Sequence, residues 1–259
     1  LGLCNVAINI QRTIADRLGV GMDDVALEHV GLNHLSWERA ARVDGVDRLP
    51  ELLANDADWV ADHVGLPVEL IRTLGAIPSY YLHYYYETAR VVAEQRDGHT
   101  RAQDVIDIEA RLLDMYRDQG LAEKPALLAD RGSAYYSEAA AQLIASLHDG
   151  AGDVQVVDMR NDGALPDLPD HAIVEIPARI DRDGAHALPL APLAPEMRGL
   201  VQAAKAYEEL TVEAACSGDR RTALRALIAN PLVGEWAIAE PLLAALLEAN
   251  RSHLPRFFR

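Results

Sequence analysis

Two residues near the start of the chain, Cys4 and His34, could together bind a metal ion. Cys4 lies in the string GLCNV at residues 2–6, and His34 lies in GLNHLSW at residues 31–37. A thiolate and an imidazole are a soft and a borderline ligand for a divalent transition metal. Two protein ligands would leave coordination positions open for water or substrate oxygens, as a catalytic metal site requires. A lone cysteine or a lone histidine is more often structural, so each residue alone is a weak indication.

A second string, residues 75–86, holds five of the nine tyrosines. Tyrosines repeated at helical spacing are usually core residues whose hydroxyls reach polar partners, so most of the five are expected to be structural. One of them could act as a base if a neighbouring cation lowers its pKa from the usual value of about 10. A divalent metal ion would be such a cation, and metal with tyrosine is therefore the chemistry that these strings favour.

Three arginines, Arg72, Arg101 and Arg131, are candidate receptors for an anion, although any one arginine is more often a solvated surface residue. The formal net charge of −16 repels anions, so an anionic substrate would need locally placed basic side chains. Arg101 follows Thr100 at a predicted helix start, where backbone N–H groups can also meet a phosphate. The same net charge argues against a nucleic-acid partner and against an anionic membrane surface.

The elements that must position these residues are a mixture of helices and strands. Apolar spacing predicts a helix over residues 6–18 that ends at Gly19 and has Cys4 at its amino terminus, where the helix dipole favours a thiolate. Residues 27–43 are predicted as a strand that carries His34 on one face, followed by a hairpin turn at Asp44-Gly45. Further helices are predicted over residues 49–64, 68–74, 80–94, 101–117, 134–147, 197–217, 220–229 and 235–250. Two further strands are predicted over residues 154–159 and 172–180.

The bulk composition sets limits on the class of protein. A chain of 259 residues that is 50% hydrophobic can bury one large core or two small ones. Its two cysteines, Cys4 and Cys216, form no disulfide framework, which favours a reducing cytoplasm. No apolar run reaches the length of a membrane span, and no Gly-rich phosphate turn opens a strand–helix series, so no dinucleotide-binding domain is expected here. Because a candidate ligand stands at position 4, we expect the chain to be the later part of a longer protein.

Read whole and in this order, the strings resemble the family 4 glycoside hydrolases, the NAD- and metal-dependent glycosidases. Cys4-Asn5-Val6 followed by Asn33-His34 is similar to the metal site of that family. The likeness continues through residues 75–86, 100–101, 131–137, 160–169 and 200–225 and covers essentially the whole chain.

Within the family, Asn5 points to the 6-phospho-β-glucosidases. That subgroup resembles this chain in having Asn after the metal-binding Cys, whereas 6-phospho-α-glucosidases carry Cys-Asp-Met-Pro and α-galactosidases and α-glucuronidases carry His after Cys. Two positions depart from the pattern. Ala7 stands where the subgroup usually has Pro, and His83 stands where relatives often have Arg or another polar residue.

The resemblance implies a redox-assisted elimination instead of a displacement by two carboxylates. NAD+ would oxidise the sugar C3 hydroxyl, a tyrosinate would remove the acidified C2 proton, and the aglycone would leave before water adds. Cys4 and His34 would hold the divalent metal, typically Mn2+. Tyr81 would be the catalytic base, with Tyr84 and Tyr85 as alternatives.

The resemblance also implies substrate contacts, a fold and partners. Asn5 and Asn33 would contact sugar hydroxyls, and Arg101 would bind the substrate, with its phosphate as one candidate contact. The substrate would be a phosphorylated disaccharide or an aryl β-glucoside 6-phosphate. Residues 1–259 would form the α+β catalytic, substrate and oligomerisation domain, with helices and antiparallel strands as in malate and lactate dehydrogenases. The N-terminal Rossmann domain of the family would be absent, and assembly as a homodimer or homotetramer is expected.

Two other functions stay open. The isolated chain could be a non-catalytic oligomerisation and metal-binding domain, in which case it would show no turnover by itself. A hydroxy-acid dehydrogenase of the same superfamily is the other alternative. It would need a catalytic His–Asp pair and no metal, and Cys4 argues against it because such an enzyme has no use for a thiolate at that position.

Overall fold

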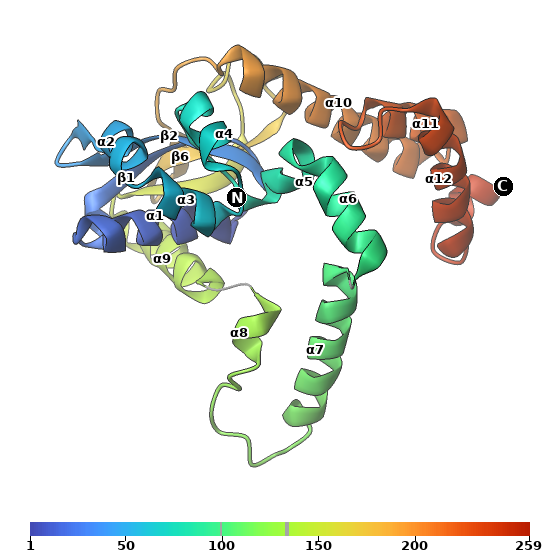
Figure 1. The fold of residues 1–259 in the computed structure, drawn as a ribbon, viewed down its shortest axis with the longest axis horizontal. Coiled ribbons are helices and arrows are strands. Elements are labelled where there is room, and N and C mark those ends of the chain that lie inside the picture. Colours follow the sequence, from blue (N-terminus) through green and yellow to red (C-terminus); the bar gives the residue numbers. More distant parts are fainter. Residues whose placement is uncertain (99, 133–134) are drawn as a thin grey trace. The chain divides into compact units, whose positions relative to one another are not determined.

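The structure, a computed structural model, describes residues 1–98, 100–132 and 135–259 (Figure 1). Its residues divide into two compact units, Leu1–Met159 with Glu175–Leu188 and Arg160–Val174 with Pro189–Arg259. Helices and antiparallel strands both contribute, which confirms the predicted α+β class. That the whole chain acts as one catalytic domain stays a prediction.

In the described part of the chain, seven strands form one sheet in the order β3-β2-β1-β6-β5, with β4 beside β2 and β7 beside β6. The strands are β1 (Val25–Leu32), β2 (Leu35–Val43), β3 (Val46–Asp47), β4 (Ile77–Pro78), β5 (Val154–Arg160), β6 (Ile173–Asp181) and β7 (Gly184–Ala187). β1 pairs antiparallel with both β2 and β6. The sheet thus brings the early hairpin next to strands that lie more than a hundred residues later.

The run predicted as one strand over residues 27–43 is instead a hairpin, β1 and β2, whose two-residue tip is Asn33-His34. Gly31 makes this tight reversal possible. Its φ is +143°, and a Cβ there would lie 2.7 Å from Ser36 Cα and closer still to the Leu35 carbonyl oxygen. His34 itself has φ 67°, so it is a turn residue and not part of a strand face.

A large core joins α1 (Asn5–Leu18) to the β1–β2 hairpin and to three short helices, α2 (Leu49–Asn55), α3 (Ala57–Val64) and α4 (Val68–Leu74). α1 ends at Gly19 in the left-handed conformation, as predicted. The helix predicted over residues 49–64 is divided at Asp56, which is non-helical. A second cluster, centred on Leu143 and Val157, packs α9 (Tyr136–Asp149) against β5 and β6.

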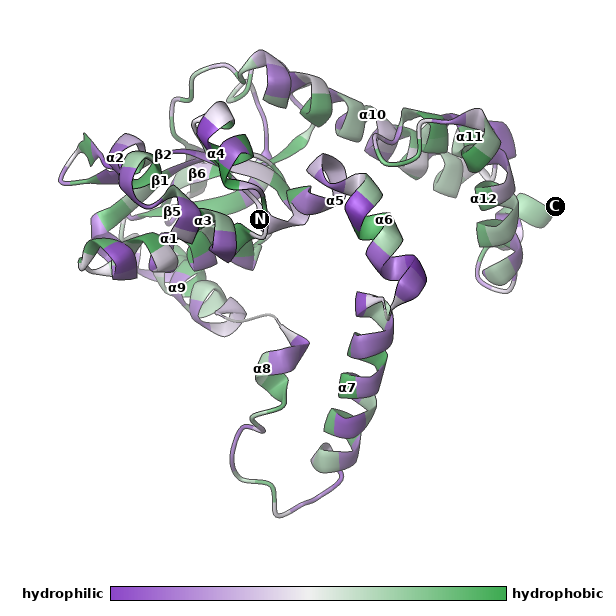
Figure 2. Ribbon diagram, in the orientation of Figure 1, coloured by the Kyte–Doolittle hydropathy of each residue, from purple (hydrophilic) through white to green (hydrophobic). Residues whose placement is uncertain are grey.

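The tyrosine string forms two short elements instead of one long helix. These are η2 (Tyr80–Leu82) and α5 (His83–Tyr86), and Glu87 then separates them from α6 (Thr88–Asp97). α7 (Arg101–Tyr116) has Thr100 as its N-cap, which forms the expected cap together with Gln103. Hydrophilic and hydrophobic residues alternate along α7 (Figure 2). α8 (Leu128–Arg131) lies against α7, and Ala134, the predicted start of the following helix, lies outside the described residues.

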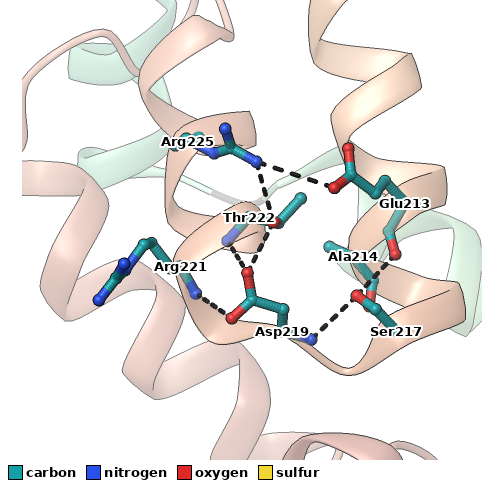
Figure 3. A network of polar contacts seen from close by, with 7 residues as sticks. All are labelled: Glu213, Ala214, Ser217, Asp219, Arg221, Thr222 and Arg225. Atoms are coloured by element: carbon teal, nitrogen blue, oxygen red, sulfur yellow. Dashed lines mark hydrogen bonds and ion pairs between the residues drawn. The ribbon is translucent and has the colours of Figure 1, made fainter.

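The second unit contains α10 (Pro195–Ser217), α11 (Arg220–Ala229), α12 (Trp236–Ala249) and η3 (Pro255–Phe258). The turn between α10 and α11 is held by Asp219, whose carboxylate accepts hydrogen bonds from the backbone N–H groups of Arg221 and Thr222 at 3.2 and 2.9 Å (Figure 3). None of the helices in the described ranges combines the length and the apolarity needed to cross a lipid bilayer.

Candidate active site

Cys4 is the N-cap of α1, and its side chain is buried. Burial raises the pKa of the thiol, and the negative charge of Glu175 raises it further. Hydrogen bonds with the Val6 backbone and with the Tyr136 side chain act in the opposite direction. The favourable effect of a helix amino terminus on a thiolate is thus outweighed, and a nearby positive charge is needed to ionise Cys4 at neutral pH.

His34 and Tyr81 stack on each other, with ring centroids 3.9 Å apart and ring planes 19° from parallel. The hairpin tip positions His34, and η2 positions Tyr81 just after its capping residue Ser79. Burial lowers the pKa of His34, although the charge of Glu175 acts against this. A lowered pKa keeps the imidazole neutral, which is the form that binds a metal ion.

Two more tyrosines lie in the same neighbourhood. Tyr80 packs against Tyr81 with ring centroids 4.5 Å apart, and their side chains share a hydrogen bond. Burial, followed by the effect of Tyr81, raises the pKa of Tyr80 above its ordinary range. Tyr136, the first residue of α9, hydrogen-bonds the Cys4 side chain. Tyr136 thus contacts the thiol and Tyr81 contacts the imidazole, while Cys4 and Tyr136 act on Tyr80 through their charges.

The two alternative bases, Tyr84 and Tyr85, make different contacts on α5. The ring centroids of Tyr84 and His83 are 4.0 Å apart. Tyr85 is 40% exposed, and its ring packs edge-to-face on Tyr86 with centroids 5.2 Å apart. Of the three tyrosines considered from sequence, Tyr81 is the one whose ring stacks on His34.

The predicted sugar-binding amides belong to the same region. Asn33 precedes His34 at the hairpin tip, and its Nδ2 donates to Asp158 Oδ2 at 3.4 Å. Asp158, on β5, also exchanges two backbone hydrogen bonds of 2.9 Å with Gly2. Asn5 is buried at the start of α1. The chain start, the hairpin tip and β5 are therefore joined at one place.

Asp158 is a carboxyl group in an unusual environment. Burial is the largest influence on it, and the negative charge of Glu175 comes next; together they raise its pKa to about 6. The hydrogen bond from Asn33 acts in the opposite direction. Asp158 therefore changes its charge close to neutral pH.

Three ionisable side chains lie side by side inside the sheet, and we call them the buried array: Glu38 on β2, His29 on β1 and Glu175 on β6. His29 Nδ1 donates to Glu38 Oε1 at 2.7 Å, and His29 Nε2 donates to Glu175 Oε2 at 2.9 Å. Their side chains are 0%, 0% and 1% exposed. Burial alone would lower the pKa of His29, but the charge of Glu38 and the hydrogen bonds with both carboxylates raise it to about 10. The array therefore holds a protonated histidine between two carboxylates.

Arg101 lies in a different local setting. Its guanidinium donates to the carbonyl oxygens of Asp130 at 2.8 Å and Arg131 at 3.2 Å, which ties the start of α7 to α8. Among the described residues, its hydrogen bonds are to this segment and not to Cys4 or His34. Ser133 and Ala134, in the string 131–137 that resembles the family, lie outside the described residues. Substrate binding by Arg101 stays a prediction.

The residues present fit a divalent transition metal held by two protein side chains. Cys4 needs a cation to ionise, and the neutral His34 ring can donate a lone pair. Within the described ranges, no group of three or more His, Cys, Asp or Glu side chains is placed to hold a metal ion. Cys4 also lines a hollow of about 580 Å³ bounded by residues of α1, β1, α9 and β5, but His34 and Tyr81 are not among its lining residues, so this hollow is not the candidate site.

Sequence analysis alone missed several residues of this region, namely His29, Glu38, Tyr136, Asp158 and Glu175. A usable signal exists for one of them. Glu175 stands between apolar neighbours in a strand-like run, and a charged residue in such a position is rarely buried unless it is paired. Its partners could not be named from the sequence, since His29 lies 146 residues away.

The geometry can be compared with known proteins. A family model described as Family 4 glycosyl hydrolase C-terminal domain matches residues 29–233. The chain is 35% identical to a "Probable 6-phospho-beta-glucosidase" of Bacillus subtilis (strain 168), over 100% of the chain and 61% of that protein. It is 34% identical to "6-phospho-beta-glucosidase BglT" of Thermotoga maritima, over 98% of the chain and 61% of that protein. The chain thus spans 61% of the length of these curated relatives.

Solved structures agree with the sequence comparison. A 6-phospho-beta glucosidase from Thermotoga maritima, solved with NAD and glucose-6-phosphate, is similar with a TM-score of 0.90 at 34% identity, over 98% of this chain and 60% of that one. Another structure of that enzyme, with manganese, NAD+ and glucose-6-phosphate, has a TM-score of 0.89 at 34% identity, with the same coverage.

Proposed function

The chain belongs to family 4 of the glycosyl hydrolases, whose C-terminal domain it matches, and on this premise we propose that it is the catalytic part of a 6-phospho-β-glucosidase. The observation that carries the proposal is the stack of Tyr81 on His34, in a region where the buried Cys4 acts electrostatically on the neighbouring Tyr80. A candidate base next to a candidate metal ligand is the arrangement that deprotonation of a metal-bound sugar requires.

Each residue of the site has a proposed task. Cys4 and His34 hold a divalent ion, Mn2+ in the first instance. Tyr81 accepts the proton from C2 of the sugar as a tyrosinate, and Asn5 and Asn33 bind and orient the sugar hydroxyls.

Arg101 is the proposed receptor for the substrate, with the 6-phosphate as the contact to test. Asn5 favours the β-glucoside, because the chain resembles the 6-phospho-β-glucosidases in having Asn after the Cys, whereas the α-specific subgroup has Asp there.

Two cofactors complete the proposed site. When they are bound, NAD+ takes up and returns the hydride of C3, and the divalent ion stabilises negative charge on the sugar oxygens. The region of the relatives that this chain does not span is the proposed location for NAD+. A tyrosine hydroxyl is ordinarily protonated at neutral pH, and a nearby cation favours the ionised form that can accept a proton. Assembly as a homodimer or homotetramer and a cytoplasmic location stay predictions.

The test is an activity assay on the chain joined to a family 4 nucleotide-binding portion. We would follow nitrophenol release from the 6-phosphorylated nitrophenyl β-glucoside, with NAD+ and Mn2+ each present or withheld. We expect turnover only when both are present, and a fall in kcat of about 100-fold or more in Tyr81→Phe, the size expected for loss of a general base. Substrate deuterated at C2 should react more slowly than the unlabelled substrate.

Matched control variants distinguish the loss of a catalytic group from a general loss of folded, active protein. Tyr84→Phe removes the same hydroxyl from a neighbouring tyrosine, and Cys216→Ser changes the other, exposed thiol. Both should keep activity, whereas Tyr81→Phe and Cys4→Ser should lose it. Turnover without NAD+, or an unchanged kcat in Tyr81→Phe, would refute the mechanism. Cleavage of only the α-anomer would refute the assignment to β-glucosides.

A further inference from the structure

The buried array, Glu38–His29–Glu175, has no task in the mechanism described so far. Its three ionisable side chains have almost no solvent exposure. Glu38 Oε2 is also buried and has no hydrogen-bond partner within the described ranges. Buried ion pairs of this kind are poor stabilisers, because taking the charges out of water often costs more than packing apolar side chains of the same volume. The best-attested use of buried polar groups is to fix the register of packed elements.

The array crosses the β1–β2 hairpin at the point where the register of the hairpin changes. Leu27 lies opposite Ala41, but His29 lies opposite Glu38, so between these two pairs β2 contains one more residue than β1. A β-bulge of this kind locally interrupts the ladder of backbone hydrogen bonds. The 2.7 Å hydrogen bond between His29 and Glu38 joins the first pair after the bulge, and it therefore fixes the register of the pairs that run from there to the hairpin tip.

The other end of the array crosses from β1 to β6. In the described part of the chain, the register between these two strands is a single pair, Gly31 opposite Glu175. The hydrogen bond from His29 Nε2 to Glu175 Oε2, at 2.9 Å, adds a side-chain contact two residues away along β1. His29 therefore bonds to both neighbouring strands, and it does so on the strand that leads into the Asn33-His34 tip.

The same registers lead to Tyr81. Glu38 lies opposite Ile77 on β4, and the Ser36 carbonyl oxygen accepts a hydrogen bond of 2.9 Å from the Ser79 N–H. Ser79 is the N-cap of η2, and its hydroxyl accepts from the Tyr81 N–H at 3.4 Å. A slip of one residue between β1 and β2 would displace the tip from η2 by about 3.3 Å. The centroids of the stacked rings are only 3.9 Å apart, so such a slip would break the stack.

We propose that His29 is a positioning residue, whose two hydrogen bonds within the buried array set the strand registers that keep Tyr81 stacked on His34. Its importance for turnover rests on the proposed function, which makes these two residues the base and a metal ligand. A displacement of about 1 Å at a reacting group can cost about 100-fold in rate, so control of the register bears directly on kcat. The stack itself can be measured without metal ion, cofactor or substrate, which allows a separate test.

The test is a proton NMR measurement on the same protein as in the activity assay, with no metal ion added. An aromatic ring stacked on an imidazole shifts the ring protons of that imidazole upfield. The Cε1–H signal of His34 is assigned as the one that is missing in His34→Gln, and Tyr81→Leu gives the position of this signal without the stack. We call the difference between the unaltered protein and Tyr81→Leu the stacking shift.

The main variant replaces the whole array by apolar side chains of similar size, His29→Leu, Glu38→Met and Glu175→Met. With no charges to bury, this apolar variant should resist urea at least as well as the unaltered protein. It has no directed hydrogen bonds between the strands, so we expect it to lose most of the stacking shift. In the activity assay its kcat should fall about tenfold or more, because the base is displaced.

Two kinds of control accompany it. Glu38→Gln and Glu175→Gln each lose a charge but keep an amide that can still hydrogen-bond His29, so both should keep most of the stacking shift. Val60→Ala leaves a cavity in the core at α3, which is not one of the elements that the array joins. It should lower the resistance to urea without changing the stacking shift.

Loss of the stacking shift in a stable apolar variant, with both Gln variants close to the unaltered protein, would support the proposal. An unchanged stacking shift in the apolar variant would overturn it, and so would an equal loss in Val60→Ala. If the apolar variant does not fold, Glu175→Leu removes only the contact with β6, and an unchanged stacking shift there would overturn the proposal. If the stacking shift behaves as expected but Tyr81→Phe keeps its kcat, the proposed function fails while the positioning of the stack stands.

Discussion

Raising the pH should destabilise the protein through a single buried proton on His29. The pKa of this imidazole is about 10 in the folded protein, because Glu38 and Glu175 outweigh the effect of burial, and it is 6.5 in an ordinary setting. Between these values the folded protein keeps a proton that the unfolded chain has lost. The stabilisation from this proton is therefore complete below about pH 6.5 and is lost as the pH rises through about 10.

The size of the effect follows from proton linkage. One bound proton corresponds to a change of about 1.4 kcal/mol in the free energy of unfolding for each pH unit inside the window. Over the whole window this amounts to about 5 kcal/mol. Domains are typically stable by only about 5–15 kcal/mol, so a shift of that size is readily measured.

The assay is urea unfolding followed by circular dichroism at pH 7, 8 and 9. The comparison is a triple variant in which His29, Glu38 and Glu175 are all replaced by Gln, which keeps polar side chains but removes every charge of the array. The difference in unfolding free energy between the two proteins should change by about 1.4 kcal/mol per pH unit, in favour of the variant as the pH rises. A difference that stays constant from pH 7 to 9 would refute the assignment of a protonated His29.

Three further predictions concern other parts of the molecule. Gly31→Ala should lower the free energy of unfolding by about 3 kcal/mol or more, because a φ of +143° is strained for alanine and the added Cβ would collide with β2. The control is Gly65→Ala, at a φ of +68° with open space around it, which should lower the free energy of unfolding by only about 1–2 kcal/mol in the same urea assay. Asp219→Ala removes the cap of α11 and should lower Tm by roughly 2–4 °C in a thermal scan, and an unchanged Tm would contradict the capping role. Native alkylation followed by mass spectrometry should label the exposed Cys216 well before the buried Cys4, and Mn2+ should slow Cys4 further; equal rates would contradict the burial of Cys4.

Local patterns were sufficient to predict many of the elements. The helices at residues 68–74 and 220–229 have the predicted bounds, because apolar spacing and flanking Gly or Asp residues act within a few positions of the chain. The hairpin tip was not predicted as a tip. Asn33 and His34 interrupt a long β-like run without a Gly in the turn itself, and Gly31, which permits the turn, stands two residues earlier.

The candidate site was predicted only in part. Cys4, His34 and Tyr81 were selected from a resemblance, since physical reasoning alone leaves five tyrosines nearly equivalent. The contact that separates Tyr81 from the others is its stack on His34, and this depends on tertiary structure. Glu175 was even less predictable from the sequence, because its effect on Cys4 arises only when β6 pairs with β1.

The hairpin tip restricts how this domain can change in length during evolution. His29 belongs to the buried array and lies on β1, the strand that leads into the Asn33-His34 tip. The array and the position of the tip therefore both depend on which side chains of β1 face each side of the sheet. One residue inserted between them would move the tip by about 3.3 Å along the strand and turn the following side chains to the opposite face of the sheet. The turn at Asp44-Gly45 carries no such double constraint, and insertions among homologous proteins should therefore accumulate there and be absent from the stretch between His29 and His34.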